Sequence, residues 1–171
     1  PWSIVLRNAN LWLLGAIVSC GSFTTYLVFS WYSTYLQIGR GVDALTASRY
    51  SGLVLAAGAV GSLLGGVVTD RIVKRTGTRS VRCAIGAAAL LSGAVAMTLS
   101  PLTDDPFWGT CGTAWSCCAI HFQLGAWWGT VMDQSGKHLG ALFGLMNSLG
   151  IPGAFGSQLF LGHFVDYLGR C

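Results

Sequence analysis

This 171-residue chain contains no glutamate, and charged residues make up only 9% of it. Soluble domains carry about 25% charged residues, so the composition argues against a water-soluble globular domain. Hydrophobic residues make up 53% of the chain, and its 24 glycines follow no collagen-like period. A membrane protein is the class that this composition indicates.

Two further classes of site lack support in the sequence. The six cysteines lie mostly within apolar runs and show no CxxC or Cys/His ligand spacing, so we interpret them as small buried apolar residues and predict no metal site. The net charge of +4 could suit a nucleic-acid partner, but half of the ten Lys and Arg residues lie within residues 71–82, between two apolar runs. We therefore predict no nucleic-acid binding.

Five segments contain no Lys, Arg, Asp or Glu and are long enough to cross a hydrocarbon core, which needs about 20 helical residues. They are residues 11–36, 50–69, 83–101, 107–132 and 139–165. These runs are too long and too rich in Gly and Ala for membrane strands, and they lack the alternation that a barrel requires. The sequence therefore predicts an all-α polytopic membrane protein with five transmembrane helices.

The cations between these segments predict an orientation. If the N-terminus lies inside, the inner side holds Arg7, Arg71, Lys74, Arg75, Arg79, Arg82 and Lys137, and the outer side holds Arg40, Arg49 and Arg170. Because cytoplasmic loops are enriched in Lys and Arg, the connection from Asp70 to Arg82 is predicted to be cytoplasmic. The absence of an initial methionine and the odd number of spans indicate a fragment of a longer chain.

Small residues recur every four positions in two of the predicted spans, and such steps let helix backbones approach closely in lipid. The second span has Gly58, Ser62 and Gly66, with Gly61 and Gly65 alongside, and the fifth has Gly140, Gly144, Ser148, Pro152 and Gly156. A static contact and a moving, gated interface would both use this spacing, so the pattern leaves the two open.

Three parts of the sequence resemble the major facilitator superfamily. The run GGVVTDRIVKRTGTR at residues 65–79 resembles the GGxxxDxxxxRxG signature loop that follows the second helix of each six-helix half. The run WYSTYL at residues 31–36 is similar to the end of the seventh helix in the anion:cation symporter branch, with Ser33 in place of the usual proline. Residues like those of the eleventh helix and its outer end are Asn147, Gly150, Gly162, Asp166 and Gly169.

The resemblance implies that residues 1–171 form part of the C-terminal bundle, helices seven to eleven, without the N-terminal half and the last helix. It also implies a gating role for Gly66, Asp70, Arg71 and Arg75, which would hold the cytoplasmic helix ends together in the outward-open state. We expect Asp70 at a helix C-terminus, where the helix dipole disfavours a carboxylate unless a cation compensates it. Alternatively, the basic residues only determine topology and face lipid phosphates.

Polar and aromatic side chains within apolar spans predict a substrate site near the membrane midplane. On the first span Tyr26 and Phe29 share one helical face, with Trp31 and Tyr35 nearer the outer end. The full set that we predict to bind substrate is Tyr26, Phe29, Trp31, Tyr35, Trp115, Gln123, Asn147 and Ser148. Amide groups can bond sugar hydroxyls and aromatic rings can stack on a sugar ring, so this set suits a hydroxylated organic acid.

Together these features predict a secondary active transporter that carries a small organic anion, a sugar acid or related carboxylate, in symport with protons. The symporter branch includes hexuronate, galactonate and sialic-acid transporters. We expect no cofactor other than the coupling ion H+, a lipid bilayer as surroundings, a plasma-membrane location and a monomeric full-length protein. No span holds a carboxylate or arginine, so the resemblance implies that the proton carrier and the anion anchor lie in the absent half.

Three alternatives stay open at this point. The protein could carry another small solute, such as a neutral sugar or a drug-like compound. It could be a truncated membrane scaffold without transport activity. It could be a membrane enzyme built on Cys117, Cys118 and His121, although none of the HExxH or GxSxG motifs accompanies them. His121 itself is interpreted as either a core histidine or a proton carrier.

Overall fold

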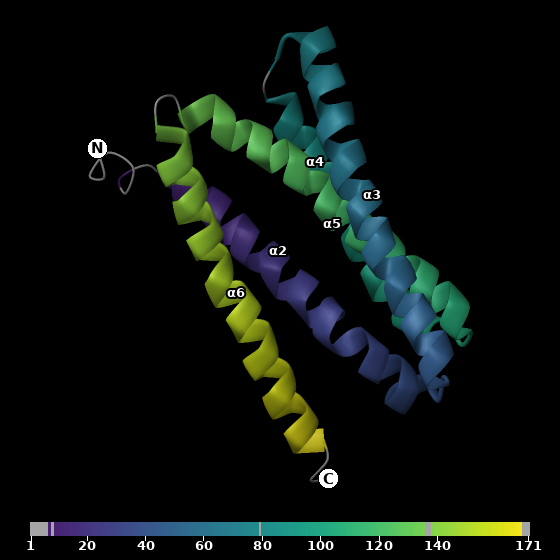
Figure 1. Cartoon of the computed structure of the whole chain (residues 1–171). Helices are drawn as coiled ribbons and strands as arrows, with labels where there is room; N and C mark the ends of the chain where they lie inside the picture. Colours follow the sequence, from purple (N-terminus) through teal and green to yellow (C-terminus); the bar gives the residue numbers. More distant parts are fainter. Residues whose placement is uncertain (1–6, 8, 79, 136–137, 169–171) are drawn as a thin grey trace. The chain divides into compact units, whose positions relative to one another are not determined.

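The computed structural model describes residue 7 and residues 9–78, 80–135 and 138–168, and these residues form helices with short connections (Figure 1). The elements are α2 (Ala9–Thr34), the π-helical turn η1 (Tyr35–Gly39), α3 (Ala44–Thr76), α4 (Val81–Leu99), the 3-10 turn η2 (Ser100–Leu102), α5 (Pro106–Ser135) and α6 (Leu139–Leu168). Among the described residues there is no strand, so the predicted all-α class is confirmed. Arg79, Lys137, Gly169 and Arg170, used in the sequence predictions, lie outside the described residues.

Within the described residues, four stretches are long and apolar enough to cross a membrane: Ala9–Gly39, Ala44–Thr76, Val81–Leu102 and Leu139–Tyr167. They contain four of the five predicted spans. The fifth predicted span, residues 107–132, falls on α5, which has 30 residues. Its length suffices for a crossing, but buried polar side chains such as Thr110, Thr113 and Ser116 lower its hydropathy. Its crossing therefore stays a prediction.

The chain divides into two compact units, and each is described by itself. Unit 1 contains Pro1–Ser30 and Lys137–Cys171, and unit 2 contains Trp31–Gly136. Unit 1 therefore holds most of α2 together with α6, while unit 2 holds α3, α4 and α5 with the turns that join them.

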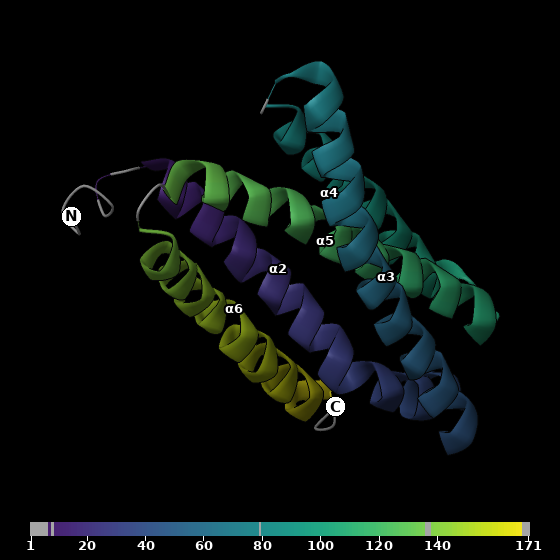
Figure 2. The same ribbon diagram turned by 45° about the horizontal axis from the view of Figure 1, so that its top comes forward.

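In unit 1, α2 and α6 run side by side and in the same direction (Figures 1 and 2). A Cβ added at Gly153 would collide with the backbone carbonyl of Ser19, and one at Gly150 would come within 2.9 Å of the Ser22 hydroxyl oxygen. By contrast, Gly140 and Gly144 have no neighbour within 4 Å of an added Cβ. Of the small residues that recur every four positions on this span, Gly156 lies near α2, with Phe23 Cδ2 3.9 Å from its added Cβ. The backbone of α2 comes closest at Gly153, beside Ser19.

In unit 2, α3 and α5 approach so closely that their backbones touch. A Cβ added at Gly61 or Gly65 would collide with the carbonyl group of Cys118 or Phe122 on α5. Gly125 of α5 makes the reciprocal contact, since its Cβ would lie 2.5 Å from the nitrogen of Gly66. Close backbone approach at glycine is a main source of helix association in lipid. Gly66 itself has open space at its own Cβ position, so the crowded stripe runs through Gly61 and Gly65.

The helix α3 ends later than its sequence predicts. The apolar run stops at Thr69, but the helix continues to Thr76, so Asp70 lies inside it and not at its C-terminus. Gly77 terminates it with φ of 67°, and its N–H donates to the carbonyl oxygen of Val73 at 2.9 Å. Hydropathy marks the edge of the hydrocarbon core, whereas a helix ends where a residue such as glycine can adopt the left-handed conformation.

The start of α3 is fixed by Asp43 in the connection that precedes it. Its carboxylate accepts hydrogen bonds from the backbone N–H groups of Leu45 and Thr46, both at 3.1 Å. Hydrogen bonds from the Thr46 side chain, then from the backbone, lower the pKa of the Asp43 carboxyl. A capping carboxylate of this kind satisfies backbone donors that would otherwise have no partner in the first helical turn.

The backbone contact between α3 and α5 predicts that neighbouring glycines tolerate alanine very differently. Gly65→Ala should destabilise the protein by about 1–3 kcal/mol, because the methyl group is forced against the Phe122 backbone. Gly66→Ala serves as the matched control and should be neutral or stabilising by up to about 1 kcal/mol, because alanine favours helix. Thermal unfolding of the purified protein in detergent measures both, and equal midpoints would contradict the packing described here.

The cation count predicts that the connection between α3 and α4 faces the cytoplasm. A single cysteine at Thr78 tests this, since Thr78 is exposed and lies beside Gly77, whose positive φ makes it unsuitable for substitution. In a variant without native cysteines, Thr78→Cys should resist an impermeant thiol reagent in intact cells and react after permeabilisation. Labelling from outside in intact cells would reverse the predicted topology.

Candidate functional site

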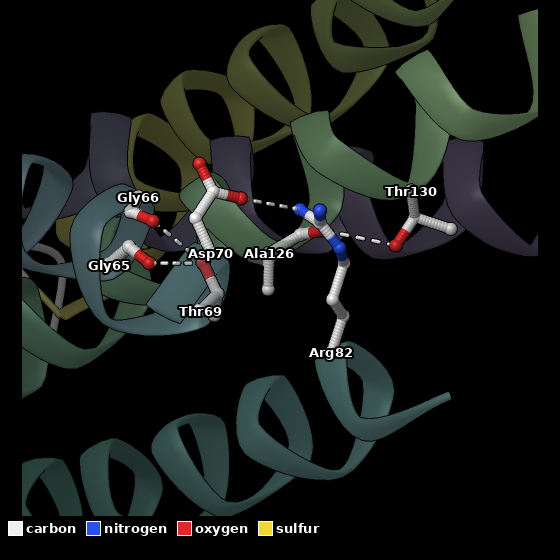
Figure 3. Close-up of polar contacts among 7 residues, drawn as sticks. All are labelled: Gly65, Gly66, Thr69, Asp70, Arg82, Ala126 and Thr130. Carbon is white, nitrogen blue, oxygen red and sulfur yellow. Dashed lines mark hydrogen bonds and ion pairs between the residues drawn. The ribbon is translucent and has the colours of Figure 1, made fainter. Parts of the chain in front are cut away.

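An ion pair joins α3 to α4 at the end of unit 2 that carries the basic residues. Arg82 Nη1 lies 3.2 Å from Asp70 Oδ1, and the side chains are 12% and 58% exposed respectively. Figure 3 shows the Arg82 guanidinium reaching from the first turn of α4 to the Asp70 carboxylate. A cation at a helix N-terminus is disfavoured by the helix dipole. The Asp70 carboxylate therefore stabilises the Arg82 cation in this position, and Arg82 in turn stabilises the Asp70 charge.

The residue before Asp70 anchors the same turn of α3. Thr69 is fully buried, and its hydroxyl donates to the carbonyl oxygens of Gly65 and, at 3.2 Å, Gly66 (Figure 3). The small residues bring this turn against α5, and the threonine hydroxyl is satisfied within its own helix. Asp70 therefore projects from a turn that is already fixed by packing.

The other predicted gating residues lie around this pair without forming it. Arg71 and Arg75 are exposed on the last turns of α3. Among the described residues, the ion pair of Asp70 is with Arg82 and not with Arg75. Sequence reasoning counted Arg82 only as a cation of the loop, although one signal was present. Gly77 lies between Asp70 and Arg82, and a sharp turn there folds the two charged residues toward each other.

Of the predicted substrate residues, four lie in unit 1 and do not form one cluster. Tyr26, Phe29, Asn147 and Ser148 are all exposed. Because α2 and α6 run in parallel and Gln158 bonds to the carbonyl oxygen of Tyr26, Tyr26 is level with Gln158. Asn147 precedes Gln158 by eleven residues, or about 16 Å along the helix. Tyr26 and Asn147 therefore lie at different levels of this helix pair.

Gln158 is a polar link between these helices. Its amide nitrogen lies 3.3 Å from the Tyr26 carbonyl oxygen and 3.2 Å from the hydroxyl oxygens of Ser30 and Ser157, three acceptors that share its two N–H donors. On the same two helices, the aromatic rings of Phe23 and Phe160 have centroids 6.0 Å apart. Amide and hydroxyl groups together with aromatic rings are the groups that recognise hydroxylated solutes.

The predicted residue Tyr35 lies in unit 2, in the π-helical turn η1, next to a cation. The Arg40 guanidinium carbon is 6.0 Å from the Tyr35 ring centroid, and the guanidinium donates to the Thr103 carbonyl oxygen. Tyr32 is buried, and its hydroxyl donates to the Thr110 hydroxyl at 2.9 Å. These contacts tie the end of the first predicted span to the connection between α4 and α5. Arg40 was predicted only as an outer-loop cation.

The remaining predicted residues of unit 2 occupy different surroundings. Trp31 is half-buried on the last turns of α2. Trp115 is 56% exposed on α5, whereas Gln123 packs against α4, with its Cγ 3.2 Å from an added Cβ at Gly86. The two α5 residues are eight positions apart, or about 12 Å along the helix, so they lie at different levels of unit 2.

The cysteine and histidine pair on α5 does not have the geometry of a nucleophile with its base. His121 Nδ1 lies 2.9 Å from the Cys117 carbonyl oxygen and 3.6 Å from the Cys117 sulfur. A carbonyl oxygen only accepts, so the contact with the Cys117 backbone is a hydrogen bond in the tautomer that carries its proton on Nδ1. In that tautomer Nδ1 cannot act as the base for the thiol.

Comparison with known proteins identifies the class of protein that this helical arrangement belongs to. The family model of the Major Facilitator Superfamily matches residues 1–157. The chain therefore belongs to this superfamily, as its signature run predicted, and it is an integral, multi-pass membrane protein. No solved structure was similar enough to count as a match.

Three relatives place the chain within the superfamily. It is 30% identical to the "Probable sulfoacetate transporter" of Cupriavidus necator over 99% of this chain and 39% of the relative. It is 29% identical to the "Probable galactarate/D-glucarate transporter" of Bacillus subtilis, over 94% and 36%. It is 27% identical to the chloroplastic "Probable anion transporter 6" of Arabidopsis thaliana, over 93% and 32%. The chain thus spans about a third to two fifths of their length. These relatives agree with the anion:cation symporter branch predicted from residues 31–36.

Proposed function

We propose that this chain belongs to a secondary transporter that carries a small organic anion across the membrane in symport with protons. The observation that carries the proposal is the family match over residues 1–157 combined with relatives named for sulfoacetate, galactarate and D-glucarate. Those three compounds share a small size and acidic groups that are ionised at neutral pH. The substrate class that we propose is therefore a small carboxylate with one further anionic or several hydroxyl groups.

In this account the chain binds the hydroxyl groups of the substrate more than its anionic groups. The predicted spans contain no carboxylate or arginine, so the proton carrier and the main anion anchor belong to other parts of the transporter. The side chains offered here are neutral: the Tyr26 phenol, the Gln158 amide beside Ser30, and Asn147. Because these groups lie at two levels of unit 1, we propose that Tyr26 and Asn147 contact the substrate at different stages of its passage.

The proposed gate is the charged turn at the end of α3. Gly66, Asp70, Arg71 and Arg75 keep the role that their resemblance to the signature loop implies, and Arg82 joins them as the ion-pair partner of Asp70. The Arg82 side chain is largely buried, so the ion pair stabilises the protein only while its geometry is favourable. That geometry exists in the state in which the ends of α3 and α4 are held together. The pair therefore favours that state, and alternation requires that this contact loosens.

The surroundings follow from the class of protein. We propose a plasma-membrane location and a monomeric full-length carrier, with the bilayer as the partner of the exposed apolar faces. Two alternatives can be tested against this proposal: a carrier of a neutral sugar or drug-like solute, and a scaffold without transport.

The test is uptake of radiolabelled galactarate and sulfoacetate into proteoliposomes, driven by a proton gradient. The proposal predicts uptake that stops when the gradient is collapsed, and neither alternative predicts such uptake.

The gate predicts a kinetic phenotype for Asp70 in the full-length carrier. Asp70→Asn removes the charge but keeps the size, so substrate Kd and expression should stay within about twofold while turnover changes by about an order of magnitude, as loss of a 1–2 kcal/mol contact allows. Asp166→Asn, an exposed carboxylate near the end of α6, is the matched control and should leave turnover unaltered. Wild-type turnover in Asp70→Asn would reduce the signature turn to a topology signal.

Substrate contact predicts a binding phenotype for Tyr26 and Asn147. Tyr26→Phe and Asn147→Ala should each raise Kd about 2- to 12-fold, since one lost hydrogen bond costs about 0.5–1.5 kcal/mol. Competition binding of hexuronates, aldonates and sialic acid to the purified full-length protein gives the values. Tyr167→Phe removes the same hydroxyl at an exposed position on α6 and should have no effect. If both site variants bind like wild type, Trp115 and Gln123 become the next candidates.

A further inference from the structure

One glycine of α5 lies directly against the guanidinium group of Arg82. At Gly129 the position of an added Cβ is already taken by Arg82 Nη1, with Cζ at 2.7 Å and Nε at 3.3 Å. Those atoms make up most of the guanidinium group, so its planar head rests on the bare Cα of Gly129. Figure 3 shows this head passing α5 between Ala126 and Thr130 on its way to Asp70. The ion pair between α3 and α4 therefore lies against α5.

Gly129 differs from the other crowded glycines of unit 2 in what it touches. At Gly61 and Gly65 the obstructing atoms belong to the backbone of α5, which cannot move without shifting a helix. At Gly129 they belong to the far end of a flexible side chain. A methyl group there would displace the guanidinium and leave the helix packing in place, so the two effects can be separated by experiment.

Displacement of the guanidinium would break the pair. The Nη1 and Oδ1 atoms are 3.2 Å apart, so a shift of about 1–2 Å, the size of a methyl group's reach, takes them beyond hydrogen-bond distance. Arg82 is 12% exposed and lies at the N-terminal turn of α4, where the helix dipole disfavours a cation. Once displaced, the guanidinium gains most by turning out to water.

We propose that Gly129 is a positioning residue for the gate, because the absence of a side chain lets the Arg82 guanidinium lie against its Cα, where it reaches Asp70 of α3. We call this contact the seat of Arg82. The inference rests on the proposed gating function for its effect on transport, but the seat itself is a structural claim that can be tested without transport. Lysine lacks the planar guanidinium head and has a compact ammonium group, so a lysine at position 82 needs the seat far less than arginine does.

The first experiment measures the position of Arg82 in the purified full-length protein. Phenylglyoxal modifies accessible arginines, and mass spectrometry reports each site. In wild type, Arg82 should react at least fivefold more slowly than the exposed Arg71 and Arg75, and Gly129→Ala should raise its rate to theirs. Gly144→Ala is the matched control, because nothing lies within 4 Å of its added Cβ, and it should leave Arg82 protected. Continued protection of Arg82 in Gly129→Ala overturns the seat.

The second experiment measures turnover in proteoliposomes. Gly129→Ala should slow or speed turnover by the same factor as Arg82→Gln, with Kd unaltered, and the Gly129→Ala/Arg82→Gln double variant should equal Arg82→Gln alone. Adding Arg82→Lys to the Gly129→Ala variant should restore turnover toward the wild-type value. Additive effects in the double variant would contradict a role through Arg82. An exposed Arg82 with wild-type turnover in Gly129→Ala would support the seat and contradict the gate, so the two failures are distinguishable.

Discussion

The contact on which unit 2 depends is the backbone approach of α3 to α5 at Gly61, Gly65 and Gly125. In lipid the hydrophobic effect does not drive helices together, so association relies on close packing and on polar contacts between them. Glycine gives the closest packing, because carbonyl groups of one helix rest directly on the Cα atoms of the other. This contact fixes the register of the two helices, and with it the place where Asp70 leaves the packed region.

The charged turn is a consequence of that register. Asp70 follows Gly65 by five residues and Gly129 follows Gly125 by four, so both lie just beyond the last backbone contact. Helix α4 packs on α5 through Gly86 and Gly93, and its first turn delivers Arg82 to the same level. Packing in the apolar part of the helices thus determines the geometry of a charged contact at their end. Unit 1 uses the same principle at Gly150 and Gly153, with Gln158 as its polar link.

Much of this fold could be predicted from the sequence, because charge-free runs of this length have few alternatives to membrane helices. The helix positions, the superfamily and the basic turn all follow from apolar runs, glycine and cation placement. The end of α3 was predicted wrongly, since hydropathy reports the hydrocarbon boundary and not the helix terminus. The close backbone contact of α6 at Gly153 was not predicted, because two glycine stripes lie on that helix and only the partner helix selects between them. Arg82 and Gly129 were missed for a related reason: their contact joins residues 47 positions apart, which no local pattern encodes.

The central claim is that the Asp70 and Arg82 pair holds the ends of α3 and α4 in one arrangement. The most direct test is a distance measurement by pulsed electron resonance between spin labels at Lys74 on α3 and Ala88 on α4, both exposed, in the full-length protein without native cysteines. The account predicts one narrow distance distribution with Arg82 present and a broader, shifted one in Arg82→Gln. The same narrow distribution in both proteins would contradict it.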